Sequence, residues 1–160
     1  MILGMSIFLF IHVVLSLAAI VAGFVVLNGL LGAQRLPGWT ALFLATTALT
    51  SATGFFLPAD RFLPSHGVGI LSLVVLLVAI LALYVFHLSM RWRAAYVVTA
   101  LAALWFNVFV LVAQAFNKVP ALIALAPTQS EPPFLIAQTI VMVIFIFVGI
   151  AALRKFHPAA

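Results

Sequence analysis

The feature that most constrains the fold is a series of long apolar stretches separated by short polar connections. Hydrophobic residues make up 68% of the chain and charged residues 6%, whereas a soluble domain carries about 25% charged residues. Too few polar side chains remain to cover a surface in water. The apolar side chains must therefore face lipid or one another, and we predict an all-α integral membrane protein.

Five stretches are long enough to cross a bilayer, whose hydrocarbon core takes about 20 apolar residues as a helix. Continuous apolar runs such as residues 70–77 lack the alternation of a membrane β-strand. We therefore predict a five-transmembrane-helix bundle that forms a single transmembrane domain over residues 1–160. The helices are expected at about 2–31, 39–57, 67–90, 94–116 and 134–153.

The basic residues indicate how the bundle is oriented. The first and third connections and the C-terminal tail hold five basic residues and no acid: Arg35, Arg91, Arg93, Arg154 and Lys155. The opposite side has two basic residues balanced by two acids. Cytoplasmic connections are enriched in Lys and Arg, so we expect the N-terminus outside and the C-terminus in the cytoplasm. The basic residues are scattered, which argues against a nucleic-acid partner.

Several kinds of chemistry are excluded or disfavoured by the residues that are missing. The chain has no cysteine, which excludes disulfides, thiolate metal sites, iron–sulfur clusters and a cysteine nucleophile. No Ser-His-Asp arrangement, zinc-protease motif, dinucleotide fingerprint or P-loop is present. All charged residues fall at expected helix ends or in connections, which argues against a pump built on a buried carboxylate. A non-enzymatic role is favoured.

A row of small and polar residues runs along the expected fourth helix. Ala95, Thr99, Ala103 and Asn107 recur at every fourth position, and Gln114 falls on nearly the same face. Small residues let helix backbones approach closely, and amide side chains form hydrogen bonds between helices. The row is therefore either a packing seam or the polar lining of a cavity.

Histidines raise the question of a haem or metal site. A membrane haem b needs two axial ligands at one depth, but His12 and His87 are expected at opposite depths and His66 is shallower than His12. Met5, His12 and Met142 have donor atoms that suit copper(I), although their spacing is unspecific. We assign no metal site and keep haem b or copper electron transfer as a minor alternative.

The two outer connections hold the densest group of functional side chains, namely Asp60, His66, Lys118 and Glu131. They predict either a ligand or partner site above the bundle or a structural loop that caps the next helix, because Ser, Thr and Pro are common at helix starts. The apolar residues 121–125 lie between prolines and are too short to span. We expect a short interfacial or re-entrant helix there.

Three segments resemble a family: Phe8 to His12, Thr53 to Pro58, and Ala126 to Phe134. They are similar to a set of small uncharacterised proteobacterial inner-membrane proteins, over most of the chain. The resemblance implies a location in the bacterial plasma membrane and implies no activity.

Together these features predict a small transporter or channel-like bundle for a small or apolar solute. A non-catalytic accessory subunit of a membrane complex is the main alternative. The expected partners are the lipid bilayer and either a second copy of the chain or a larger membrane complex. The candidate ligand-binding residues are His12, Asp60, His66, Asn107, Gln114, Lys118 and Glu131.

Overall fold

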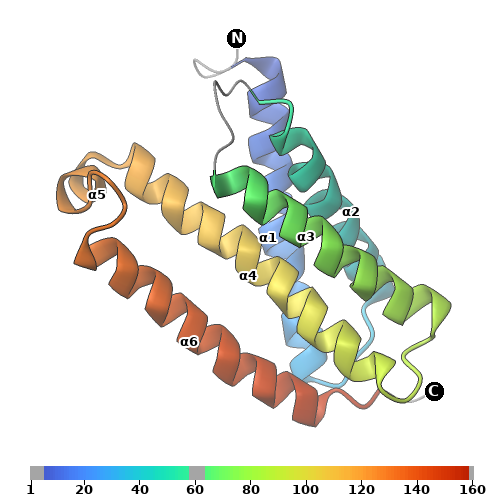
Figure 1. The fold of residues 1–160 in the computed structure, drawn as a ribbon. Coiled ribbons are helices and arrows are strands. Elements are labelled where there is room, and N and C mark those ends of the chain that lie inside the picture. The colour runs from blue at the N-terminus through green and yellow to red at the C-terminus, as the bar shows by residue number, and fades with distance from the viewer. Residues whose placement is uncertain (1–5, 58–63, 159–160) are drawn as a thin grey trace.

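The computed structural model describes residues 6–57 and 64–158, and all regular structure in these ranges is helical. The elements are α1 (Ile7–Leu31), α2 (Pro37–Gly54), α3 (Pro64–Ile80), the π-helix η1 (Leu81–Val85), α4 (Trp92–Lys118), α5 (Pro120–Leu125) and α6 (Pro132–Lys155). The long helices run alternately between the two ends of a bundle, and α6 lies along α4 at one side (Figure 1).

Four helical segments are long and apolar enough to cross a membrane, at Ile7–Leu31, His66–Val85, Trp92–Lys118 and Pro132–Lys155. Large apolar side chains cover their outer faces; Val74 and Phe147, for example, are 55% and 69% exposed. Apolar patches of this extent are rare on proteins that face water, and they suit a hydrocarbon solvent. The chain is a multi-pass helical membrane protein.

The second expected span, 39–57, corresponds to α2, which is not among the four segments apolar enough to be identified as membrane spans. It begins at Pro37, because proline is compatible with the first turn of a helix, and ends at Gly54. Its threonines lower its hydropathy, but the Thr46 and Thr53 hydroxyls donate to backbone carbonyls one turn earlier at 2.7 Å. These hydroxyls are therefore satisfied inside the helix.

The third segment ends earlier than the sequence predicts. Its expected end at about residue 90 is too late, because the helix widens into η1 and stops at Val85. His87, Leu88 and Met90 then adopt positive φ angles of 48°, 59° and 46°, which no right-handed helix contains. By contrast, α4 and α6 extend the predicted segments by two residues at each end, and α5 covers the short apolar stretch.

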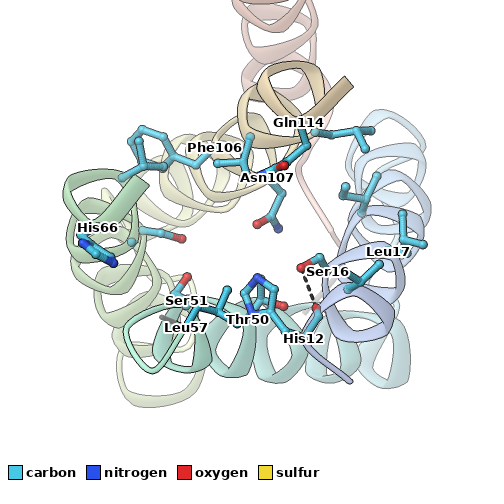
Figure 2. Close-up of a pocket in the computed structure, with 18 of the residues that line it drawn as sticks. His12, Ser16, Leu17, Thr50, Ser51, Leu57, His66, Phe106, Asn107 and Gln114 are labelled. Atoms are coloured by element: carbon cyan, nitrogen blue, oxygen red, sulfur yellow. Dashed lines mark hydrogen bonds between the residues drawn. The ribbon is translucent and has the colours of Figure 1, made fainter. Parts of the chain in front are cut away.

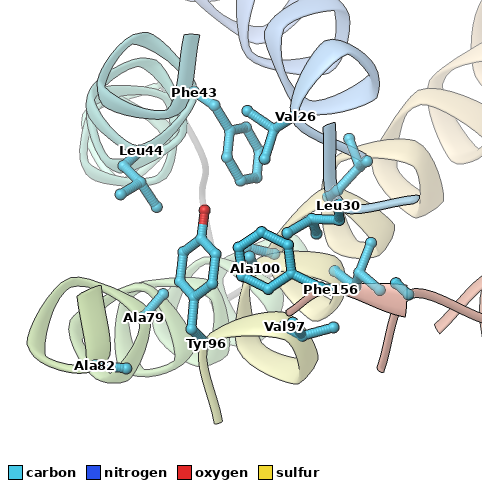
Figure 3. Packing of buried hydrophobic residues seen from close by; sticks show 14 of the residues in the cluster. Val26, Leu30, Phe43, Leu44, Ala79, Ala82, Tyr96, Val97, Ala100 and Phe156 are labelled. Carbon is cyan, nitrogen blue, oxygen red and sulfur yellow. The ribbon is translucent and has the colours of Figure 1, made fainter. Parts of the chain in front are cut away.

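The core lies where α1, α2, α3 and α4 meet, in the half of the bundle nearer the turn between α1 and α2 (Figure 3). Val26, Phe43, Ala79 and Val97 are among its buried members. Gly23 allows the closest approach, since a Cβ built there would lie 2.5 Å from Leu104 Cδ1 and 3.0 Å from Phe43 Cε2. This glycine lets α1 pack directly against side chains of α2 and α4.

Candidate functional site

A cavity of about 690 Å³ lies among α1, α2, α3 and α4, at the end of the bundle where α4 finishes (Figure 2). We call it the solute cavity. Apolar side chains make up most of its wall. Gln114 and Lys118 are exposed and mark its mouth. Its polar lining consists of His12, Ser16, Thr50, Ser51, His66, Ser72, Asn107, Gln114 and Lys118.

The His12 ring is held by a hydrogen bond between helices. Its Nδ1 lies 2.8 Å from Thr53 Oγ1, and that hydroxyl donates its own proton to the Leu49 carbonyl at 2.7 Å. With the Thr53 proton on the Leu49 carbonyl, Thr53 Oγ1 accepts from His12 Nδ1–H, and in the neutral ring Nε2 is then an acceptor. Figure 2 shows the ring pointing into the cavity towards Asn107. The fold thus presents one defined imidazole lone pair to whatever enters.

Asn107 faces His12 from α4. Its Nδ2 donates to the hydroxyl of the fully buried Thr47 at 3.1 Å, which leaves one N–H and the carbonyl oxygen of the amide for a ligand. Further along the same row, Ala103 is fully buried and Thr99 donates to its own helix. The row is therefore a packing seam towards the middle of the bundle and a cavity lining from Asn107 outwards.

Two hydroxyls in the cavity wall, on Thr50 and Ser72, have no hydrogen-bond partner among the described residues. Ser72 is only 2% exposed. An unpaired buried hydroxyl costs about 1–3 kcal/mol, and both of these oxygens are closed off from solvent. The sequence offered one signal for this residue, since Ser72 is the single polar side chain in the apolar run 70–77.

The structure brings together five of the seven candidate residues around the solute cavity: His12, His66, Asn107, Gln114 and Lys118. The His66 ring stacks on Phe55 with centroids 5.6 Å apart. Asp60 lies outside the described residues. Four further polar residues line the cavity and were not predicted as ligand-binding residues. They carry hydroxyl side chains and are Ser16, Thr50, Ser51 and Ser72.

Glu131 does not line the cavity, and its carboxylate instead forms hydrogen bonds within the connection between α5 and α6. Its carboxylate accepts hydrogen bonds from the Thr128 N–H and hydroxyl at 3.1 and 2.8 Å, and from the Ser130 N–H at 3.1 Å. Desolvation raises the pKa of Glu131, but these hydrogen bonds outweigh it and lower that pKa below its ordinary value. This contact network orders the turn that leads into α6.

The bundle closes beyond the cavity. Ala22 of α1, Thr47 of α2, Leu76 of α3 and Leu104 of α4 are each at most 1% exposed. With Gly23 they form a packed region that we call the closed layer. The solute cavity therefore ends within the bundle and does not continue to the opposite end.

No group of three or more His, Cys, Asp or Glu side chains that could hold a metal ion occurs in the described part of the chain. Of the copper prediction, Met5 lies outside the described residues and Met142 is 38% exposed on α6. Comparison with protein-family models, curated proteins and solved structures gave no match. The solute cavity is thus the feature from which a function can be inferred.

Proposed function

We propose that the protein is a small transporter or channel-like bundle that takes a small apolar or amphipathic solute into the solute cavity. The observation that carries this proposal is the composition of the wall, which is apolar with a few inward polar groups. Cavities of roughly 300–1,000 Å³ with such walls are typical of small-molecule sites, and this one has about 690 Å³.

The polar groups define the chemistry of the solute. His12 Nε2 accepts a hydrogen bond, and the Asn107 amide donates and accepts. Lys118 adds a positive charge at the mouth, and the described lining contains no carboxylate. A neutral or anionic solute with a hydroxyl or carbonyl group fits this wall, whereas a cation is repelled.

We infer further that all five long helices span, with the N-terminus outside and the C-terminus in the cytoplasm of a bacterium. With its 18 residues, α2 is about 27 Å long at 1.5 Å per residue, close to the hydrocarbon thickness of roughly 30 Å. It holds no charged residue and packs along α1 and α3. In this orientation the solute cavity opens to the outside.

The topology can be tested with single cysteines, because the chain contains none. Gln34→Cys lies between α1 and α2, Ser89→Cys between η1 and α4, and Ser130→Cys before α6. An impermeant maleimide added to spheroplasts should label position 130 and spare positions 34 and 89. If α2 does not cross the membrane, positions 34 and 89 will instead fall on opposite sides.

Binding can be tested at Asn107→Cys. Val143→Cys on α6 is the matched control, because it lies at a similar distance from its helix end and is exposed outside the cavity. A small water-soluble thiol reagent should modify position 107 faster, and a lipophilic phenol should slow only that reaction. Equal rates at the two positions, with no protection at 107, would contradict the proposal.

A second function, as a non-catalytic subunit of a membrane complex, is supported by α6. This helix packs mainly on α4, and Leu135, Ile140 and Phe147 are among its many exposed side chains. Mild-detergent purification from native membranes tests it: a partner that leaves when Phe147→Ala is introduced favours the subunit role.

The absorption spectrum of the same preparation tests haem b, since a Soret band that His12→Ala removes would favour electron transfer.

A further inference from the structure

A second cavity, of about 240 Å³, lies at the opposite end of the bundle, beyond the closed layer. We call it the basic cavity. It is framed by the turn between α1 and α2 and by the end of α3 with η1. Its polar wall consists of Gln34, Arg35, Thr40, Tyr84, His87 and Tyr96. Nothing in the proposed solute function uses these residues.

The charge at this end is unbalanced. The chain has only two acidic residues, Asp60 and Glu131, and Glu131 precedes α6 at the end of the bundle that holds the solute cavity. Five basic residues belong to the end with the basic cavity. Arg93 is engaged with the backbone carbonyls of Leu153 and Phe156. Arg35 remains exposed beside the basic cavity and has no acidic partner among the described residues.

The donors around Arg35 suit an oxyanion. A guanidinium presents several N–H groups in a fixed fork that matches phosphate, and the Gln34 amide and Tyr84 hydroxyl can add donors. The floor of the cavity is closed by the buried residues Val26, Thr40, Tyr96 and Phe156. Tyr84 lies in the π-helix η1 and His87 in the turn that follows it, and π-helices are frequent at functional sites.

The surroundings of the basic cavity are apolar on the side that faces lipid. Trp39, Tyr84 and Val85 are 45%, 51% and 56% exposed. A phosphate ester seated at Arg35 could therefore keep acyl chains against the outer faces of α2 and α3. Basic pockets between membrane helices bind anionic lipid head groups in this way.

We propose that the basic cavity binds the phosphate group of an anionic phospholipid, with Arg35 as its main contact and Tyr84 and His87 beside it. The test is native mass spectrometry of the purified full chain in mixed micelles. Three probes are compared: phosphatidylglycerol, phosphatidylcholine and inorganic phosphate. Arg35→Gln is the test variant, and Arg154→Gln is the matched control because it removes a charge from the same end without lining the cavity.

We expect wild type to retain phosphatidylglycerol over phosphatidylcholine, and Arg35→Gln to lose about fivefold in that retention, as removal of one positive charge near a lipid surface predicts. Arg154→Gln should retain it. Displacement of the lipid by inorganic phosphate would show that the site binds free phosphate. Phosphate would then still be the group that Arg35 recognises, but it would not belong to a lipid. Equal losses in both variants would indicate that the lipid is held by general surface charge, and this would overturn the proposal. Equal retention of both lipids by the wild type would also overturn it, and that comparison does not depend on the folding of any variant.

Discussion

His12 Nδ1 lies 2.8 Å from Thr53 Oγ1, and this contact joins α1 to α2 across 41 residues of sequence. The Thr53 hydroxyl is itself committed to a carbonyl of its own helix. A chain of two hydrogen bonds therefore holds the orientation of the ring. The orientation of the His12 ring therefore depends on a residue of a different helix.

Replacing the acceptor should release the ring. In Thr53→Val the Nδ1–H loses its partner, and we expect a loss of about 0.5–1.5 kcal/mol in the free energy of unfolding. The ring nitrogens, labelled with ¹⁵N, should then report a mixture of tautomers by NMR. Thr139→Val is the control, since Thr139 also donates to its own helix and is exposed on α6. A single unchanged tautomer in Thr53→Val would show that another group fixes the ring.

Arg93 fastens the end of α6 to the start of α4. Its Nη1 donates to the carbonyls of Leu153 and Phe156 at 3.0 and 2.7 Å. We expect Arg93→Gln to lower the free energy of unfolding by about 1–3 kcal/mol, because hydrogen bonds from a charged donor are the stronger kind. Amide exchange around residues 153–158 should accelerate. Arg91→Gln, at an exposed position two residues earlier, should leave that exchange unchanged.

Gly23 sits in the closed layer with no room for a methyl group. Gly23→Ala would place a Cβ 2.5 Å from Leu104 Cδ1, and overpacking of this kind costs about 1–3 kcal/mol. Gly38→Ala is the control, because nothing lies within 4 Å of its added Cβ and alanine favours a helix. Unfolding in mixed detergent micelles should separate the two variants.

A second change tests whether the contact itself is responsible. Leu104→Ala in the Gly23→Ala background removes the clashing methyl, so the two substitutions should cost less together than the sum of their separate costs. Contacting residues typically show coupling of about 0.5–3 kcal/mol. Strict additivity would mean that α1 moves away from α4 as a unit.

The turn before α6 should respond to acid. The pKa of Glu131 is raised by desolvation but lowered more by hydrogen bonds from Thr128 and Ser130, which leaves it below the ordinary value of 4.5. A carboxylate with a depressed folded pKa stabilises the fold above its ordinary pKa, and this contribution is lost as the pH falls through the folded value. The protection factors of the Thr128 and Ser130 amides, which correct for the intrinsic pH dependence of exchange, should therefore be high at neutral pH and fall below pH 4.5. Glu131→Gln should exchange faster at neutral pH as well.

The helical fold was predictable because lipid leaves the backbone few choices. Apolar runs of sufficient length must satisfy their own N–H and C=O groups, and a helix does so within one segment. The end of the third helix was not predictable in this way. Leu88 is buried and its N–H donates to the Ala82 carbonyl at 2.9 Å, so tertiary packing of one leucine stops the helix within an apolar stretch.

The candidate site was predictable in part. His12, Asn107 and Gln114 stand out because polar side chains are costly inside lipid. Their partners Thr47 and Thr53 were not identified, since which threonine faces which helix depends on the rotation of each helix about its axis. One sequence without known contacts does not determine those rotations.

The closed layer has an electrical consequence. If the solute cavity fills with water, the potential of the adjoining solution extends inwards as far as Asn107, and the membrane voltage falls mainly across the thin layer around Ala22, Leu76 and Leu104. An elementary charge that crosses this layer therefore changes its free energy by nearly the full membrane value, about 2.3 kcal/mol per 100 mV. Under the transport function proposed above, an inside-negative voltage would therefore oppose an anionic solute that crosses this layer inwards and favour one that crosses it outwards.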